Sequence, residues 1–258
     1  MQNIVFTKRI SKGTRFNQIY VPRELEISLQ PGDLVEVRLI EKKEVIYFHN
    51  IKFLSDFKKE LITKIFQKIL HFRIEQIFVV GSFLHEKTQY HDIDIVIILD
   101  KLNEKVEKQI YDELTAEFSL NFHLLSIKKD NLEKLLKICP LTKSMFEIFA
   151  SNKELKPSYE KIIDKNHLLM LLMMPEDLLE IDVNSRVYYD GLRRAITIRN
   201  FLINKSLSSK KVNEEVENIL GSEIFQLLRN NELIDNKTLQ TVRERIREEL
   251  NKINKLIK

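Results

Sequence analysis

The hydrophobic residues follow three different patterns along the chain. In residues 1–48 apolar and polar residues alternate, most clearly from Leu34 to Ile40. Such alternation is typical of a strand with one buried face and one face in water. Pro31-Gly32-Asp33 comes directly before this run and indicates a turn. The pattern predicts a small β module over residues 1–48.

Residues 50–150 alternate instead between helix and strand patterns. Apolar side chains, Phe57 among them, recur at three- and four-residue spacing from Ile51 to Phe72, which predicts a long amphipathic helix. A second helix is expected over residues 106–118. Strands are expected at residues 77–80, 93–99 and 122–127. The middle one is apolar on both faces and is therefore expected inside its sheet. This order predicts an α/β or α+β fold.

From about residue 159 the pattern is that of helices throughout. Ser185 is expected to cap a helix that continues to Leu202. Further helices are expected over residues 212–220, 224–228 and 239–257. The sequence therefore predicts a helical bundle domain over residues 155–258.

Composition limits the class of protein. The chain has 258 residues, 43% of them hydrophobic, so it can bury a core and is not disordered overall. Its longest apolar run, residues 168–174, is far shorter than the roughly 20 residues of a membrane span, and its start lacks the order of a signal peptide. The single cysteine, Cys139, excludes an internal disulfide and a cysteine zinc cluster. We expect a cytoplasmic protein without membrane contact.

The candidate ligand-binding residues lie where one expected strand ends and the next begins. Gly81 and Ser82 follow the first of these strands, and glycine lets a backbone approach an anion closely. Asp92 and Asp94 lie at the start of the next strand and project to the same face. Two acids on an apolar strand repel each other, and a cation such as Mg²⁺ would relieve that repulsion. The pattern predicts a site for a metal-bound nucleoside triphosphate.

The compound motif formed by Gly81-Ser82 and Asp92-Ile-Asp94 resembles the signature of the nucleotidyltransferase superfamily, of the polymerase-beta-like, minimal type. The resemblance covers residues 50–150 and implies an α+β domain with a small mixed sheet and flanking helices. It also implies transfer of a nucleoside monophosphate from an NTP, with ATP expected. Gly81 and Ser82 would then hold the triphosphate, while Asp92 and Asp94 would ligate Mg²⁺ or Mn²⁺.

The sequence departs from this family where a third carboxylate is expected on a following strand. Residues 120–126 contain no Asp or Glu, but Asn121 and His123 project to one face and either can occupy that position. Asn121 would ligate a metal through its side-chain carbonyl but cannot act as a base. His123 would accept a proton, because histidine titrates near neutral pH. Asp100 lies at the far end of its strand and cannot substitute.

Other basic residues have two interpretations each. Lys87, between the two halves of the motif, either contacts phosphate or is a solvated loop lysine. Arg193, Arg194 and Arg199 share one expected helix, where they either face phosphate or nucleic acid or form a solvated face.

The N-terminal region carries a second resemblance. Residues 20–25 and the turn at Pro31-Gly32-Asp33, followed by alternating valines, are similar to AbrB-like swapped-hairpin domains. This resemblance implies a small dimeric β module, and many such domains bind DNA. A basic surface for DNA and an ordinary solvated strand face explain the nearby basic residues equally well; these are Lys8, Arg9, Lys12 and Arg15.

Two hypotheses from different classes follow. The first is a homodimeric metal-dependent nucleotidyltransferase that acts on a hydroxyl acceptor, which is an RNA end such as that of tRNA, a protein or a small molecule. The second is a nucleotide-binding pseudoenzyme that serves as a DNA-binding regulator or scaffold through the AbrB-like region. The missing third carboxylate favours the second hypothesis, and the intact glycine-serine and aspartate motifs favour the first.

Overall fold

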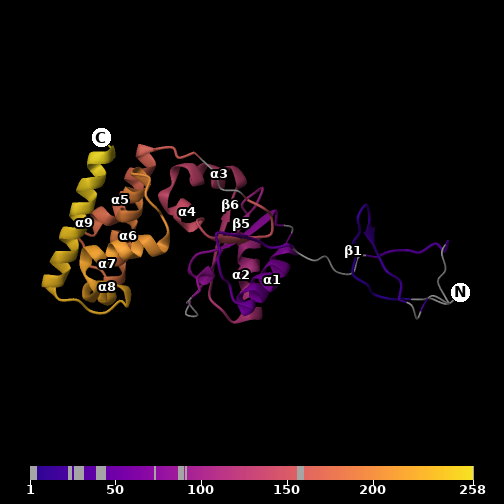
Figure 1. Ribbon diagram of the computed structural model, residues 1–258. Coiled ribbons are helices and arrows are strands. Elements are labelled where there is room, and N and C mark those ends of the chain that lie inside the picture. The colour runs from indigo at the N-terminus through magenta and orange to yellow at the C-terminus, as the bar shows by residue number, and fades with distance from the viewer. Residues whose placement is uncertain are drawn as a thin grey trace. The chain divides into compact units, whose positions relative to one another are not determined.

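The chain forms two compact units, Met1–Lys43 and Glu44–Lys258. The computed structural model (Figure 1) describes residues 5–22, 25, 32–38, 45–72, 74–86, 90, 92–155 and 160–257. The bundle expected at the C-terminus and the α+β domain before it belong to the same unit.

The N-terminal unit contains a short hairpin. Strand β1 (Ser11–Lys12) pairs antiparallel with β2 (Asn17–Gln18), and the amide of Gly13 donates a hydrogen bond to the carbonyl of Phe16 across the turn (3.1 Å). Residues 34–38, the described part of the strand expected up to Ile40, have no strand pairing, and Leu34 is fully exposed. The AbrB-like module stays a prediction, because several of its residues lie outside the described part of the chain.

A five-stranded mixed sheet is the framework of the second unit. Its order is β3-β7-β4-β5-β6, and only the pair β5–β6 is parallel. The strands are β3 (Tyr47–His49), β4 (Gln76–Val80), β5 (Ile93–Ile98), β6 (Phe122–Ile127) and β7 (Phe149–Ser151). β5 is internal and, apart from Asp94, buried on both faces, as its apolar residues on both faces predict. The three expected strands are confirmed, and β3 and β7 are added to them.

Helices cover both faces of this sheet (Figure 1). On one face α1 (Asp56–Leu70) and α2 (Glu104–Phe118) pack against alternate residues of β4 and β5, such as Val79 and Ile95. On the other face α3 (Lys129–Ile138) and the residues after α4 (Pro140–Met145) pack against Phe78 and Val96. The expected α+β class with a small mixed sheet is confirmed.

The C-terminal part is helical, as expected, and α6 (Ser185–Leu202) is its central helix. The other helices are α5 (Lys165–Asp177), α7 (Ser209–Leu220), α8 (Ser222–Arg229) and α9 (Asn236–Ile257). The cap of α6 is Asn184, whose side chain accepts from the amide of Val187, so the expectation for Ser185 is wrong by one residue. None of the helices within the described ranges is both long and apolar enough to span a membrane.

Two of the three α6 arginines singled out above, Arg193 and Arg199, have partners within the bundle. Arg199 is largely buried and forms ion pairs with Glu215 of α7 and Glu249 of α9. Arg193 donates a hydrogen bond to the hydroxyl of Ser209 (2.9 Å). Arg199 therefore connects three helices of the bundle, and it contributes neither to a solvated face nor to an open basic surface.

Asp235 provides a test of how the longest helix begins. Its carboxylate accepts a hydrogen bond from the amide of Thr238 (2.7 Å), and this interaction lowers the pKa of Asp235. A lowered pKa means that the carboxylate stabilises the fold above its unfolded pKa of about 4, and that this contribution is lost as the pH falls through the folded value. We expect Asp235→Ala to lower the free energy of unfolding near neutral pH, and Asp235→Asn to lower it less because asparagine also caps helices.

Urea unfolding at about pH 7 and about pH 2 measures this effect. The difference between the wild type and Asp235→Asn should vanish at the acidic pH. An equal difference at both pH values would contradict the assignment of this carboxylate as the cap of α9.

Candidate functional site

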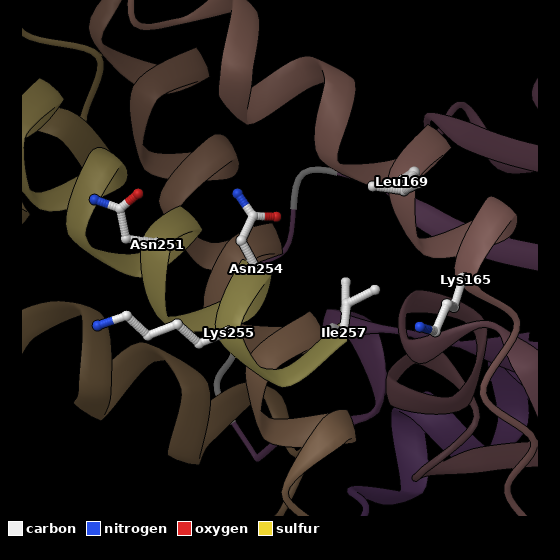
Figure 2. Close-up of a pocket in the computed structure, with 6 residues that line it drawn as sticks. All are labelled: Lys165, Leu169, Asn251, Asn254, Lys255 and Ile257. Atoms are coloured by element: carbon white, nitrogen blue, oxygen red, sulfur yellow. The ribbon is translucent and has the colours of Figure 1, made fainter.

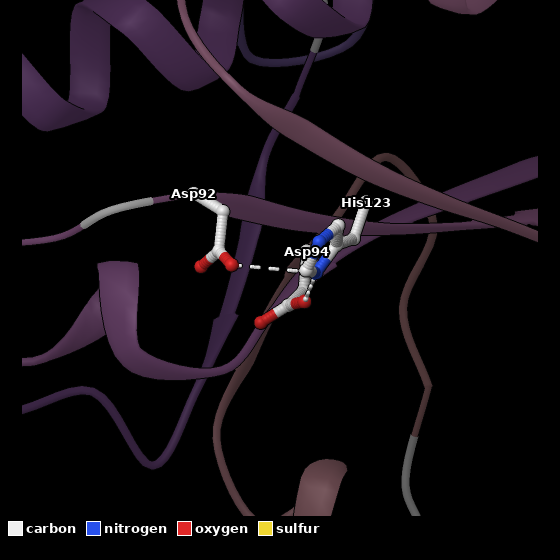
Figure 3. A group of neighbouring side chains, drawn as sticks. All are labelled: Asp92, Asp94 and His123. Atoms are coloured by element: carbon white, nitrogen blue, oxygen red, sulfur yellow. Dashed lines mark ion pairs between the residues drawn. The ribbon is translucent and has the colours of Figure 1, made fainter. Parts of the chain in front are cut away.

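The candidate site lies at one end of the sheet, where β4 ends and β5 and β6 begin. In the strand register, Asp94 of β5 pairs with Val80 of β4 on one side and with His123 of β6 on the other. Paired residues of neighbouring strands point to the same face, so the side chains of Asp94 and His123 lie side by side (Figure 3). Asp92, one residue before β5, projects to that face too.

These three side chains converge. Nδ1 of His123 lies 3.3 Å from Oδ2 of Asp92 and 3.3 Å from Oδ1 of Asp94 (Figure 3). One ligand atom of each residue falls within 4.8 Å of the others. The carboxylates are about one third exposed, whereas the imidazole is 71% exposed. The group is therefore held by the sheet and open to solvent at the imidazole.

The two carboxylates affect each other electrostatically. Burial, and after it the negative charge of Asp92, raises the pKa of Asp94, while the neighbouring His123 partly offsets that rise. A divalent cation between the carboxylates would favour their charged forms. The two carboxylates supply the oxygen donors that Mg²⁺ or Mn²⁺ prefers, so the residues present fit a divalent metal.

Gly81 is required by both its conformation and its surroundings. Its φ of 80° lies in the region that favours glycine, and a Cβ atom there would collide with Oδ2 of Asp94. Ser82 begins a single turn of 3₁₀-helix, η2 (Ser82–Leu84). The amide of Leu84 donates a hydrogen bond to the carbonyl of Gly81 (3.3 Å), and the amide of His85 donates one to the carbonyl of Ser82 (3.1 Å). These two bonds close the turn beside the carboxylates.

The structure gives less information about the other residues that the sequence analysis considered for the site. Asn121 directly precedes β6, and its main-chain carbonyl accepts a hydrogen bond from the amide of Ile93 (3.0 Å). Metal ligation by its side chain stays a prediction. Lys87 lies outside the described residues. Asp100 follows the far end of β5, as expected, and is not part of the converging group.

Lys58 is a buried residue near the site that the sequence pattern did not single out. Its ammonium donates hydrogen bonds to the carbonyls of Phe83 (2.7 Å) and His85 (2.6 Å). Lys58 lies four residues after Leu54 and three before Leu61, at a position where the helical spacing calls for an apolar residue. This charged residue in an apolar pattern is the signal that could have revealed it. The neighbouring Phe57, expected on the buried face, is instead 64% exposed, whereas Lys58 is 5% exposed.

A separate cleft of about 600 Å³ lies between α5 and α9 (Figure 2). The residues that line it are Lys165, Leu169, Asn251, Asn254, Lys255 and Ile257. This lining has no carboxylate and no imidazole, and it includes none of the site residues expected from the sequence. The converging group on β5 and β6 therefore remains the candidate for metal chemistry.

The chain was also compared with known proteins. No curated protein and no solved structure matches it. A family model described as the nucleotidyltransferase domain matches residues 59–168, a range that includes Gly81, Ser82, Asp92, Asp94 and His123. The family match, together with the converging side chains, supports a nucleotidyltransferase core in the middle of this chain.

Proposed function

We propose that the protein is a metal-dependent nucleotidyltransferase that transfers a nucleoside monophosphate from an NTP, with ATP expected, to a hydroxyl acceptor. The observation that carries this proposal is the convergence of Asp92, Asp94 and His123 beside Gly81. The matched domain supports nucleotidyl transfer in general. The acceptor class is an RNA end, a protein or a small molecule.

Each residue has a role in this reaction. Asp92 and Asp94 hold the cations, with Asn121 as a further ligand, while Gly81, Ser82 and Lys87 hold the triphosphate. When bound, Mg²⁺ or Mn²⁺ would activate the acceptor hydroxyl and neutralise the leaving pyrophosphate. The acceptor oxygen forms a bond to the α-phosphorus, and the bond from that phosphorus to the bridging oxygen of the β-phosphate breaks.

His123 receives the proton that the acceptor hydroxyl loses. Its ring is exposed, so an acceptor can reach it, and Nδ1 lies against both carboxylates. An imidazolium formed there gains charge-assisted contacts with Asp92 and Asp94. A histidine at this position thus supplies the proton acceptor that the missing third carboxylate would otherwise provide.

The central test is transfer of label from α-phosphate-labelled ATP, or another NTP, with Mg²⁺ or Mn²⁺, into the RNA, protein and small-molecule fractions of a cell extract. We expect Asp92→Asn to abolish incorporation because it removes a metal ligand. Asp100→Asn, at the opposite end of the same strand, is the matched control and should retain full activity. Undiminished labelling by a folded Asp92→Asn protein would refute the proposed site.

Substitution of Gly81 tests the packing beside Asp94. We expect Gly81→Ala to abolish transfer because its Cβ displaces the Asp94 carboxylate. Gly221→Ala is the matched control: Gly221 has a φ of 81° and nothing within 4 Å of an added Cβ, so it shares the backbone strain without the collision. Strain of this kind costs about 1–3 kcal/mol.

Thermal unfolding and labelling of both glycine variants separate the two effects. Gly221→Ala should lose some stability and keep its activity. Equal activity in the two variants would show that the contact between Gly81 and Asp94 is unimportant for catalysis.

Substitution of His123 tests its role as proton acceptor. We expect His123→Gln to reduce the rate of transfer by at least about a hundredfold, the usual contribution of general base catalysis. Binding of Mn²⁺, measured by electron paramagnetic resonance, should stay close to that of the wild type. Loss of Mn²⁺ binding together with activity would make His123 a metal ligand instead.

A further inference from the structure

We infer that Lys58 is a positioning residue that holds the turn from Gly81 to His85 in the shape that receives the triphosphate. The part of this inference that concerns triphosphate rests on the proposed function. Lys58 lies on α1, one residue before the range that the family model matches, so the comparison carries no information about it.

The ammonium of Lys58 contacts this segment at several points. It donates to the carbonyl of Phe83 (2.7 Å) inside the 3₁₀ turn and to the carbonyl of His85 (2.6 Å) directly after it. It also lies 5.1 Å from the centre of the Phe83 ring and 5.6 Å from that of Tyr90. These two rings pack edge to face with their centres 4.8 Å apart.

These contacts connect the two halves of the site. Phe83 and His85 belong to the turn that begins at Gly81, and Tyr90 lies two residues before Asp92. One buried cation thus ties the end of the turn to the chain that enters the strand with the carboxylates. Hydrogen bonds to a charged donor are stronger than neutral ones, and cation–π contacts add to them.

Packing alone does not account for a lysine at this position. The neighbouring positions of the apolar stripe, Leu54, Leu61 and Ile65, are buried hydrophobic residues. An ammonium is costly to bury, and desolvation lowers the pKa of Lys58 accordingly. A leucine or methionine would fill the stripe without that cost, but neither can bind the two carbonyls.

The experiment compares Lys58→Met with Lys64→Met. Lys64 lies on the same helix but is exposed and paired with Glu60 (2.9 Å), so it controls for the loss of one lysine from α1. Three quantities are measured: affinity for Mn²⁺ alone, affinity for ATP in the presence of Mn²⁺, and hydrogen exchange of the amides of residues 82–86. Lys58→Arg, which keeps a charged donor, serves as the rescue variant.

If Lys58 positions the turn, Lys58→Met binds Mn²⁺ alone as the wild type does, because the carboxylates are intact. Its affinity for ATP falls about tenfold, the equivalent of one lost hydrogen bond to a charged group. Exchange at residues 82–86 becomes faster while exchange in α5–α9 is unchanged. Lys64→Met shows none of these changes, and Lys58→Arg recovers part of the ATP affinity.

Unchanged exchange at residues 82–86 in Lys58→Met would overturn the inference, and so would an equal loss of affinity for Mn²⁺ and ATP with a general loss of stability. If Lys58→Met does not fold, Lys58→Gln is measured in the same way, with the same expected result. A wild-type protein that binds neither Mn²⁺ nor ATP would refute the proposed function instead. In that case the exchange measurement still decides whether Lys58 holds the turn.

Discussion

The site depends on one electrostatic constraint, which is that two carboxylates lie close together at the start of a buried strand. Asp92 and Asp94 gain no stability from this arrangement, and the raised pKa of Asp94 reflects its burial and the repulsion between them. Each neighbour accommodates the pair in a different way. Gly81 has no side chain to collide with Asp94, and His123 brings a nitrogen to 3.3 Å from both carboxylates. A fold selected for stability alone would replace such a pair with apolar residues.

Most of the fold could be predicted because its elements are long enough to show a period. β5 was recognisable because five of its six residues are apolar and occupy both faces, and the amphipathic helices were recognisable from the spacing of their apolar residues. β3 and β7 have three residues each, too few for a periodic pattern, and they form only because β7 pairs with both β3 and β4. The cap of α6 was misplaced by one residue because asparagine and serine are adjacent and both are good caps.

The site was predictable to the extent that it is local in sequence. Residues i and i+2 of a strand share a face, so the sequence alone predicted that the side chains of Asp92 and Asp94 lie close together. His123 was one of two candidates, and only the parallel register of β5 and β6 places it beside Asp94. Lys58 was missed because its partners, Phe83 and His85, are more than twenty residues away in the chain. A lysine in an apolar stripe becomes interpretable only when the carbonyls that solvate it are known.

The helical bundle limits where an acceptor can be recognised. Arg199 is held by Glu215 and Glu249, and such a buried pair is costly to separate, so this arginine is not available to an incoming phosphate. The end of α6 is also occupied, because the ammonium of Lys161 donates to the carbonyls of Phe201 (2.9 Å) and Leu202 (3.2 Å), at the negative end of the helix dipole.

The segment after α6 is tied to the nucleotidyltransferase core as well. Leu207 accepts a hydrogen bond from the hydroxyl of Ser144 (2.6 Å) and donates one to the carboxylate of Glu147 (3.1 Å). Arg199 of α6 thus stabilises the bundle, and the segment after this helix joins the bundle to the core. In the proposed reaction, recognition of the acceptor would therefore come from groups other than Arg199 and the end of this helix.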